Sequence, residues 1–274
     1  MEYKPLIIII DLDGTIIGDI TPQLIAYEIS RELKFMHKFS TKDFQYKLQH
    51  GIIRPGFKSF IKNVKRSQPN IEFFIYTASE KTWANFVIKQ IETALHIKFN
   101  RPIFNRDDCI LDDSHNEYQK CIKQITPRLF TSVHKKYPIL KKDDLLKRVL
   151  IIDNNSVYRM SDEPSLVLCS TYDYKHPENM ILYLTRHDYE QQYHRIHHIF
   201  GKYIKLKETS NWLKFQRLFY TYFLNQLLSC EKNNARYLQD TFWITLEQIL
   251  VNKKFSKFGS KTVSYINQKS SFII

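Results

Sequence analysis

The sequence predicts an α/β fold, a doubly wound and mostly parallel sheet covered by helices. Two observations carry this prediction: short apolar runs recur along the chain, and helical patterns separate them. Four runs of four to six residues are rich in β-branched and other apolar residues: 6–10, 71–76, 149–152 and 166–169. Continuous apolar runs are typical of strands that are buried on both faces, as in a parallel sheet. Strands that alternate with helices then favour the α/β class.

Helical patterns fill the stretches between the runs. Thr21 and Pro22 are typical of an N-cap followed by proline at the first helical position, and they open the pattern QLIAYEISRELKFM. Apolar residues at three- and four-residue spacing predict two further helices, in GFKSFIKNVKRS and in TWANFVIKQIETAL. The stretch from about 104 to 140 is less regular and rich in charge, and we expect it to be an insertion near the functional edge of the sheet.

From about residue 189 the pattern changes to two or three amphipathic helices with aromatic and leucine stripes. We therefore expect two domains, the sheet domain at 1–190 and a basic helical C-terminal extension at 191–274. Aromatic rings interleaved with Lys214 and Arg217 could stack on bases, but a helix that packs an apolar face is the better interpretation. We expect the extension to be a separate appendage that contributes to partner binding; the alternative, which its aromatic residues suggest, is that it packs on the sheet domain and completes its core.

Composition and charge narrow the class of protein. The 274 residues have a formal net charge of +13, which favours anionic partners such as nucleic acid, phosphorylated protein or an anionic membrane surface. From Lys175 onward there are 15 Lys and Arg against 7 Asp and Glu, so the C-terminal region is the candidate contact for nucleic acid or another polyanion. The alternative explanation of the positive charge is a solvated basic surface without a specific partner.

The cellular setting follows from the cysteines and from the apolar runs. The four cysteines have no metal-ligand spacing, which is typical of free thiols in a reducing compartment. No apolar run approaches the roughly 20 residues needed for a transmembrane segment. We expect a soluble intracellular protein of the cytoplasm or nucleus. The lysine- and asparagine-rich composition suits a large DNA virus, with action in the host cell, or an A/T-rich eukaryote.

Polar side chains follow three of the four apolar runs. In open α/β sheets, ligands bind beyond the carboxyl ends of the strands. Polar turns after strands are common and would explain one such ending, but they explain less well an aspartate directly after two of the runs. We therefore expect a functional site built from three pairs of residues: Asp11 and Asp13, Thr77 and Ser79, Asp153 and Asn154.

Phosphoryl transfer to a carboxylate is the chemistry that needs this arrangement. Asp11 would attack phosphorus and form an aspartyl-phosphate, and Asp13 would protonate the leaving oxygen and then deprotonate the hydrolytic water. Clustered acids would repel an anionic substrate unless a hard cation intervened, and Mg²⁺ takes oxygen ligands. Thr77 would donate a hydrogen bond to a phosphoryl oxygen, and a lysine would balance its charge.

The motifs DLDGT, YTAS and DNN, each after an apolar run, resemble the ordered motifs of the haloacid dehalogenase superfamily. The segments that begin RPGFKSF and KKYPILKK are similar to those of phosphatases that act on the C-terminal domain of RNA polymerase II. The resemblance covers about residues 5 to 185. It implies a Mg²⁺-dependent protein serine/threonine phosphatase with a phosphoprotein substrate, the polymerase C-terminal domain among the candidates.

The same resemblance assigns roles to individual residues. Asp11 matches the nucleophile and Asp13 the acid/base, and both match metal ligands, Asp13 through its backbone carbonyl. Thr77 matches the phosphate-binding residue, with Ser79 beside it in the substrate site.

The remaining roles fall in the second half of the chain, apart from one arginine. Lys136 best matches the third-motif lysine, in catalysis and substrate binding, with Lys135 as the competing choice. Asn154 matches the metal-ligating residue, with Asp153 as the acid beside it. Arg54 matches an Arg-Pro pair of the family and is interpreted as structural.

Two alternatives stay open at this point. One is a phosphatase of the same fold that acts on nucleic-acid ends or small metabolites, and the high positive charge favours nucleic acid within that class. The other is a non-catalytic subunit that keeps the fold to bind protein or nucleic acid. The complete set of expected site residues argues against the second alternative.

Overall fold

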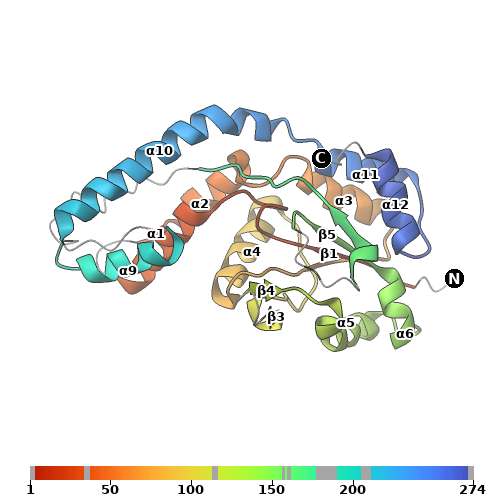
Figure 1. The fold of residues 1–274 in the computed structure, drawn as a ribbon. Helices are drawn as coiled ribbons and strands as arrows, with labels where there is room; N and C mark the ends of the chain where they lie inside the picture. Colours follow the sequence, from red (N-terminus) through yellow and green to blue (C-terminus); the bar gives the residue numbers. More distant parts are fainter. Residues whose placement is uncertain are drawn as a thin grey trace.

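The computed structural model describes residues 4–33, 38–112, 117–155, 158, 162–176, 190–204 and 211–270 (Figure 1). Its centre is a four-stranded parallel sheet in the order β2-β1-β5-β6. All four predicted strands are present: β1 Leu6–Ile10, β2 Ile71–Ile75, β5 Val149–Asp153 and β6 Leu166–Leu168. Every residue of β1, β2 and β5 is buried, which is why these strands are mostly apolar rather than alternating; Glu72 in β2 and Asp153 at the end of β5 are the charged exceptions.

Helices cover both faces of the sheet, which confirms the doubly wound α/β class. One face of β1, with Ile8 and Ile10, packs in a core shared with α3 (Phe57–Ser67) and α4 (Lys81–Leu95). The other face, with Ile7 and Ile9, packs on α5 (Ile122–Lys136) and the short α6 (Lys142–Leu145). Both helices expected from GFKSFIKNVKRS and TWANFVIKQIETAL are therefore present.

Between β1 and Arg54 the described residues include the helices α1 (Thr21–Glu32) and α2 (Thr41–Lys47) and the turn η1 (Leu48–Ile52). The N-cap expectation for Thr21 is wrong, because Thr21 is already the first helical residue. Its backbone N–H donates to the Asp19 carboxylate at 2.9 Å, so Asp19 satisfies this end of the helix.

The charged stretch after residue 104 contains an antiparallel pair of short strands and a helix. The turn η2 (Arg106–Asp108) precedes β3 (Ile110–Asp112) and β4 (Glu117–Gln119), and the chain then enters α5. Because α5 covers a face of the sheet, the second half of this stretch belongs to the layers of the α/β fold.

The C-terminal region divides into two packing groups. Helix α9 (Tyr193–Tyr203) and the long α10 (Trp212–Leu238) form a separate apolar cluster with α1. Helices α11 (Phe242–Asn252) and α12 (Ser260–Lys269) instead contribute to the same core as β1 and α3, and Figure 1 shows α11 beside α3.

Trp243 is at the centre of the contact between α11 and α3. Its ring lies 4.9 Å from that of Phe57 and 4.6 Å from that of Phe60, and its Nε1 donates to the Thr15 carbonyl at 3.3 Å. We expected the whole C-terminal extension to be a separate appendage. That prediction is wrong for α11 and α12, because their apolar residues complete the core of the sheet domain. The division at residue 190 itself stays a prediction.

Among the described residues, no helix combines the length and the apolar character that a membrane span requires.

Candidate active site

The carboxyl ends of β1 and β5 bring two aspartates together. Asp11 follows the last residue of β1, and Asp153 is the last residue of the neighbouring β5. The Asp11 backbone N–H donates to the Ile152 carbonyl at 2.9 Å, so the pairing of the strands continues to the site. Both carboxylates are buried.

A buried lysine lies between these two carboxylates. Lys120 Nζ contacts Asp11 Oδ1 and lies 2.7 Å from Asp153 Oδ2, and only 2% of the residue is exposed. The rings of Tyr76 and Tyr158 flank it, with centroids 5.8 and 5.6 Å from Nζ. Burial alone would lower the pKa of Lys120, but the two aspartates raise it above its usual range, so the lysine is charged.

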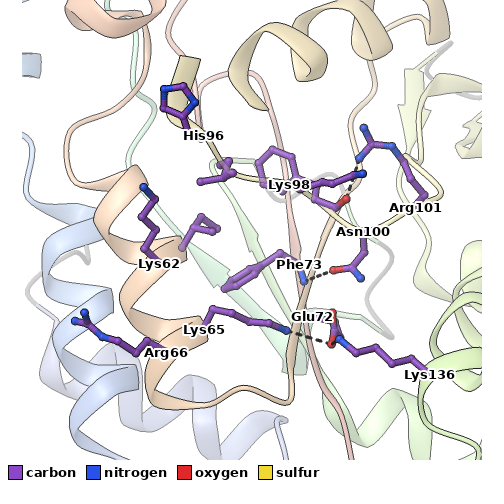
Figure 2. Close-up of a pocket in the computed structure, with 13 residues that line it drawn as sticks. Lys62, Lys65, Arg66, Glu72, Phe73, His96, Lys98, Asn100, Arg101 and Lys136 are labelled. Atoms are coloured by element: carbon purple, nitrogen blue, oxygen red, sulfur yellow. Dashed lines mark hydrogen bonds and ion pairs between the residues drawn. The ribbon is translucent and has the colours of Figure 1, made fainter. Parts of the chain in front are cut away.

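The expectation that Lys136 supplies this charge is wrong. Lys136 is the last residue of α5, and its Nζ lies 2.7 Å from Glu72 Oε1 (Figure 2). Lys120 precedes the first turn of α5, so the 15-residue helix separates the two lysines by about 22 Å at 1.5 Å per residue. The competing choice, Lys135, is exposed on the same last turn and does not belong to the site either.

The physical reason for the error is that basic residues are common at helix C-termini, where they interact favourably with the helix dipole. Lys135 and Lys136 fit that general preference and need no catalytic explanation. A signal for Lys120 was present: it directly precedes Cys121 and Ile122, where the apolar periodicity of α5 begins. A lysine at that border lies near the carboxyl ends of the strands, whereas the last turn of α5 lies near the start of β2, where Lys136 contacts Glu72.

The second acid of the first motif is held by the end of β2. Asp13 Oδ2 accepts a hydrogen bond from Ser79 Oγ at 2.7 Å and one from Thr77 Oγ1 at 3.1 Å. The Ser79 backbone N–H donates to Thr77 Oγ1 at 3.1 Å, which fixes the hydroxyl of the fully buried threonine. The predicted residues of the first two motifs are therefore in contact.

Asn154 packs against the loop that carries the first motif. Its backbone N–H donates to Thr15 Oγ1 at 3.0 Å, and the Thr15 hydroxyl donates to Asn154 Oδ1 at 3.1 Å. Gly14 makes this approach possible. Its φ is +77°, and a Cβ at this position would lie 2.6 Å from Asn154 Nδ2.

The site holds more negative than positive charge. Burial raises the pKa of Asp11 to about 7, and Asp153 and Asp13 add to this rise while Lys120 opposes it. Burial also raises the pKa of Asp13, against the hydrogen bonds from Ser79 and Thr77. Three carboxyl groups near one lysine leave negative charge that a divalent cation would offset.

The residues present fit Mg²⁺ as a ligand set. Among the described residues, no three His, Cys, Asp or Glu side chains form a ready-made metal cage. Mg²⁺ does not require one, because it commonly binds through one or two carboxylates and keeps several waters. The Asp11 carboxylate, the Asp13 carbonyl and the Asn154 amide oxygen are the available hard donors, with the acid Asp153 beside them.

Arg54 lies behind the site and is buried. Its Nε and Nη2 donate to the two carboxylate oxygens of Asp240 at 2.8 and 2.7 Å, and its remaining donors reach Cys169 and Ser170. All five guanidinium donors are therefore engaged within the protein, which agrees with a structural role. The contact ties the end of β6 to the start of α11.

A basic groove lies at the opposite end of β2 (Figure 2). The pocket has a volume of about 720 Å³, and its lining contains one acid, Glu72. Seven of its residues are basic: Lys62, Lys65, Arg66, His96, Lys98, Arg101 and Lys136. Glu72 is the second residue of β2 and Thr77 lies just beyond its end, so about 16 Å of strand separates groove and site.

Glu72 neutralises only part of this charge. It lies 3.2 Å from Lys65 Nζ and 2.7 Å from Lys136 Nζ, while Arg101 is paired with Glu92 at 2.8 Å. Burial lowers the pKa of Lys65, and the charge of Lys136 adds to this effect while Glu72 opposes it.

Solved structures similar to this chain include two of the polymerase phosphatase Fcp1. One, described as Fcp1, an essential RNA polymerase II CTD phosphatase, is 19% identical, with a TM-score of 0.45; the match covers 96% of this chain and 64% of that one. The other is an Arg-to-Ala variant of fission yeast Fcp1 bound to beryllium fluoride, with 19% identity, 90% and 62% coverage and a TM-score of 0.46. This chain therefore spans less than two thirds of either structure.

A third similar structure is the HAD domain of the effector protein Lem4 from Legionella pneumophila. It has 17% identity and a TM-score of 0.32, and the match covers 57% of this chain and 76% of that domain. No curated protein matches the chain. The model of one family, the NLI interacting factor-like phosphatases, matches residues 6–193, which include every residue of the site described above. The chain therefore belongs to the NLI interacting factor-like phosphatase family.

Proposed function

We propose that this protein is a Mg²⁺-dependent phosphatase that forms an aspartyl-phosphate on Asp11 and acts on phosphoserine or phosphothreonine in proteins. The observation that carries the proposal is the buried lysine between two carboxylates at the ends of adjacent parallel strands. A non-catalytic subunit would have no physical reason to keep three carboxyl groups and a lysine in one buried site, since each buried charge is costly.

In the first step, an Asp11 carboxylate oxygen attacks the phosphorus of the substrate. The new bond joins that oxygen to phosphorus, and the bond between phosphorus and the seryl or threonyl oxygen breaks. Asp13 donates its proton to the leaving oxygen, which departs as a hydroxyl. Burial favours the protonated form of Asp13, because its pKa is raised.

In the second step, water attacks the phosphorus of the aspartyl-phosphate. Asp13, now a carboxylate, accepts a proton from that water, and the bond between Asp11 and phosphorus breaks. The products are inorganic phosphate and the regenerated Asp11 carboxylate. Asp13 therefore returns to its protonated state, and the cycle closes without any further reactant.

The remaining residues bind and orient the phosphoryl group. Lys120 supplies positive charge beside Asp11, and Thr77 and Ser79 supply hydroxyl donors. Bound Mg²⁺, held by Asp11, the Asp13 carbonyl and Asn154, would offset the negative charge of site and substrate. Asp153 holds Lys120 from the other side and accepts the Asn155 backbone N–H at 2.8 Å, so it keeps the lysine in position.

The substrate class rests on the family and on the charge of the groove. The two Fcp1 structures are of phosphatases for the RNA polymerase II C-terminal domain, so a phosphoserine heptad peptide is the first substrate to test. The experiment compares this peptide with a 3′-phosphorylated oligonucleotide and an aryl phosphate, with and without Mg²⁺. We expect Mg²⁺-dependent release of phosphate, fastest from the peptide. Preference for the oligonucleotide would favour an enzyme of nucleic-acid ends, and no turnover of any substrate would contradict the proposal.

We also propose that the basic groove binds polyanionic segments of the substrate. Its lining residues come from α3, β2, the loop that follows α4, and the end of α5, whereas the C-terminal region was the expected contact. Two of the groove lysines, Lys62 and Lys98, are exposed and have no acidic partner among the described residues. The groove therefore has uncompensated positive charge, and its distance from Thr77 excludes it from the chemical step.

A further inference from the structure

Helix α10 carries an exposed apolar stripe on one side. Its opposite side, with Phe215, Phe219 and Phe223, is buried against α1 and α9. The exposed fractions along the stripe are 69% for Leu213, 49% for Tyr220, 39% for Leu224, 64% for Leu228 and 53% for Leu238. At 100° per residue these five side chains lie within an arc of about 80°. Figure 1 shows α10 along the outer edge of the molecule.

Three other exposed residues share this arc: Arg217, Glu231 and Ala235. Apart from Leu238, the residues of this arc are arranged symmetrically about Leu224. Tyr220 and Leu228 lie four residues to either side of it, and Leu213 and Ala235 lie eleven residues to either side. Arg217 and Glu231 lie seven residues to either side, so the charge changes sign across the centre.

We infer that two copies of this chain pair through α10 in an antiparallel arrangement centred on Leu224. A twofold axis at that residue places Leu224 against the partner's Leu224 and Tyr220 against the partner's Leu228. It also places Arg217 against the partner's Glu231, and the reciprocal contact forms on the other side of the axis. The larger Leu213 meets the small side chain of the partner's Ala235.

The charges select the antiparallel arrangement over a parallel one. A parallel pair in the same register would put Arg217 against the partner's Arg217 and Glu231 against the partner's Glu231. In the antiparallel pair the flanking lysines meet amides: Lys214 lies opposite the partner's Asn234, and Lys232 lies opposite the partner's Gln216. Like charges therefore do not meet along the stripe, and two apolar surfaces leave water.

The stripe lies beyond residues 6–193, the part of the chain that the family model matches. Pairing through α10 is therefore a property of this chain's extension and is independent of the proposed chemistry. The buried side of α10 packs in a different apolar cluster from the central strand β1, so the stripe and the site lie on separately packed parts of the chain.

The test measures the dissociation constant of the full-length chain by analytical ultracentrifugation. We expect a concentration-dependent dimer. Arg217→Glu and Glu231→Arg should each weaken it by about tenfold, because each places like charges in contact, and the double reversal should restore it. Leu224→Lys should weaken it further. All these positions are exposed, so aryl phosphate turnover should not change, and the melting temperature measured well below the dissociation constant should not change either.

A cysteine at the centre gives a second readout. Under mild oxidation Leu224→Cys should form a disulfide-linked dimer, whereas the matched control Asn225→Cys, on the neighbouring residue but off the stripe, should not. A chain that stays monomeric at all concentrations overturns the inference. A dimer in which the double charge reversal fails to rescue the single variants overturns the antiparallel register.

Discussion

At one end of the sheet a lysine lies between two carboxylates, and at the other end a carboxylate lies between two lysines. Lys120 joins Asp11 and Asp153, whereas Glu72 joins Lys65 and Lys136. The first cluster is fully buried and is left with negative charge; the second is partly exposed and is left with positive charge. In the function proposed above, the negative cluster binds a cation together with a phosphoryl group, and the positive groove binds anionic segments of the substrate.

The largest expected effect separates Lys120 from Lys136. Lys120→Met should lower kcat by about 10²- to 10³-fold or more, because it removes the charge that faces the transferred phosphoryl group. Lys136→Met should leave kcat within about twofold. Steady-state hydrolysis of an aryl phosphate measures both variants. An equal loss of kcat in the two variants would contradict the assignment of Lys120, and not Lys136, to the active site.

A melting curve must accompany that comparison. Lys120→Met also leaves Asp11 and Asp153 buried without their partner, and breaking such a pair costs about 3–5 kcal/mol. We therefore expect a lower melting temperature for Lys120→Met and nearly the wild-type value for Lys136→Met, whose side chain is mostly exposed.

The next largest effect concerns Asp11, the proposed nucleophile. Without metal, its ionisation should make the free energy of unfolding depend on pH. The folded-state pKa of Asp11 is raised to about 7, so between its unfolded value near 4 and pH 7 the folded chain binds more protons than the unfolded chain. The free energy of unfolding should therefore fall as pH rises through this window and level off above it. The Asp11→Asn variant should not show this pH-dependent fall in the free energy of unfolding.

Chemical denaturation in EDTA at pH 4, 5.5 and 7.5 measures the difference. We expect Asp11→Asn to match the wild type at pH 4 and to exceed it at pH 7.5. The excess in the free energy of unfolding should be at most about 1.4 kcal/mol for each unit by which the pKa of Asp11 is higher in the folded chain than in the unfolded chain. The same variant should have lost nearly all turnover. A constant difference across the pH range would mean that Asp11 is not the group whose charge is disfavoured.

The smallest expected effect lies in the groove. In the Asp11→Asn background, which cannot hydrolyse the ligand, Lys62→Glu with Lys98→Glu should weaken binding of a multiply phosphorylated peptide by about tenfold and reduce its salt dependence. The matched control reverses two exposed lysines of the C-terminal region, Lys254→Glu with Lys257→Glu. If the control weakens binding and the groove variant does not, the C-terminal region is the anion contact, as its composition suggested.

The residues next to the strands could be predicted from the sequence because strand ends fix their positions. A continuous apolar run identifies a buried parallel strand, and such strands present their carboxyl ends at one edge of the sheet. Asp11, Asp13, Thr77 and Asp153 all lie within a few residues of such an end, so no tertiary information was needed to bring them together.

Lys120 and α11 could not be placed in this way. Lys120 reaches the site through β4 and the start of α5, so its position depends on how the stretch after residue 104 packs rather than on a strand of the sheet. The apolar pattern of α11 predicts a helix with a buried face, but not the surface that covers it. Trp243 fills the core beside Phe57 and Phe60, and no local pattern indicates that contact.

Beryllium fluoride tests the central claim most directly, because with Mg²⁺ it mimics a phosphoryl group bound to a carboxylate. The measurement is the melting temperature of wild type and Asp11→Asn, with beryllium fluoride, in the presence and absence of Mg²⁺. We expect a rise of several degrees for the wild type with Mg²⁺ only, and none for Asp11→Asn under any condition. An equal rise in Asp11→Asn, or a rise in wild type without Mg²⁺, would contradict an aspartyl-phosphate on Asp11.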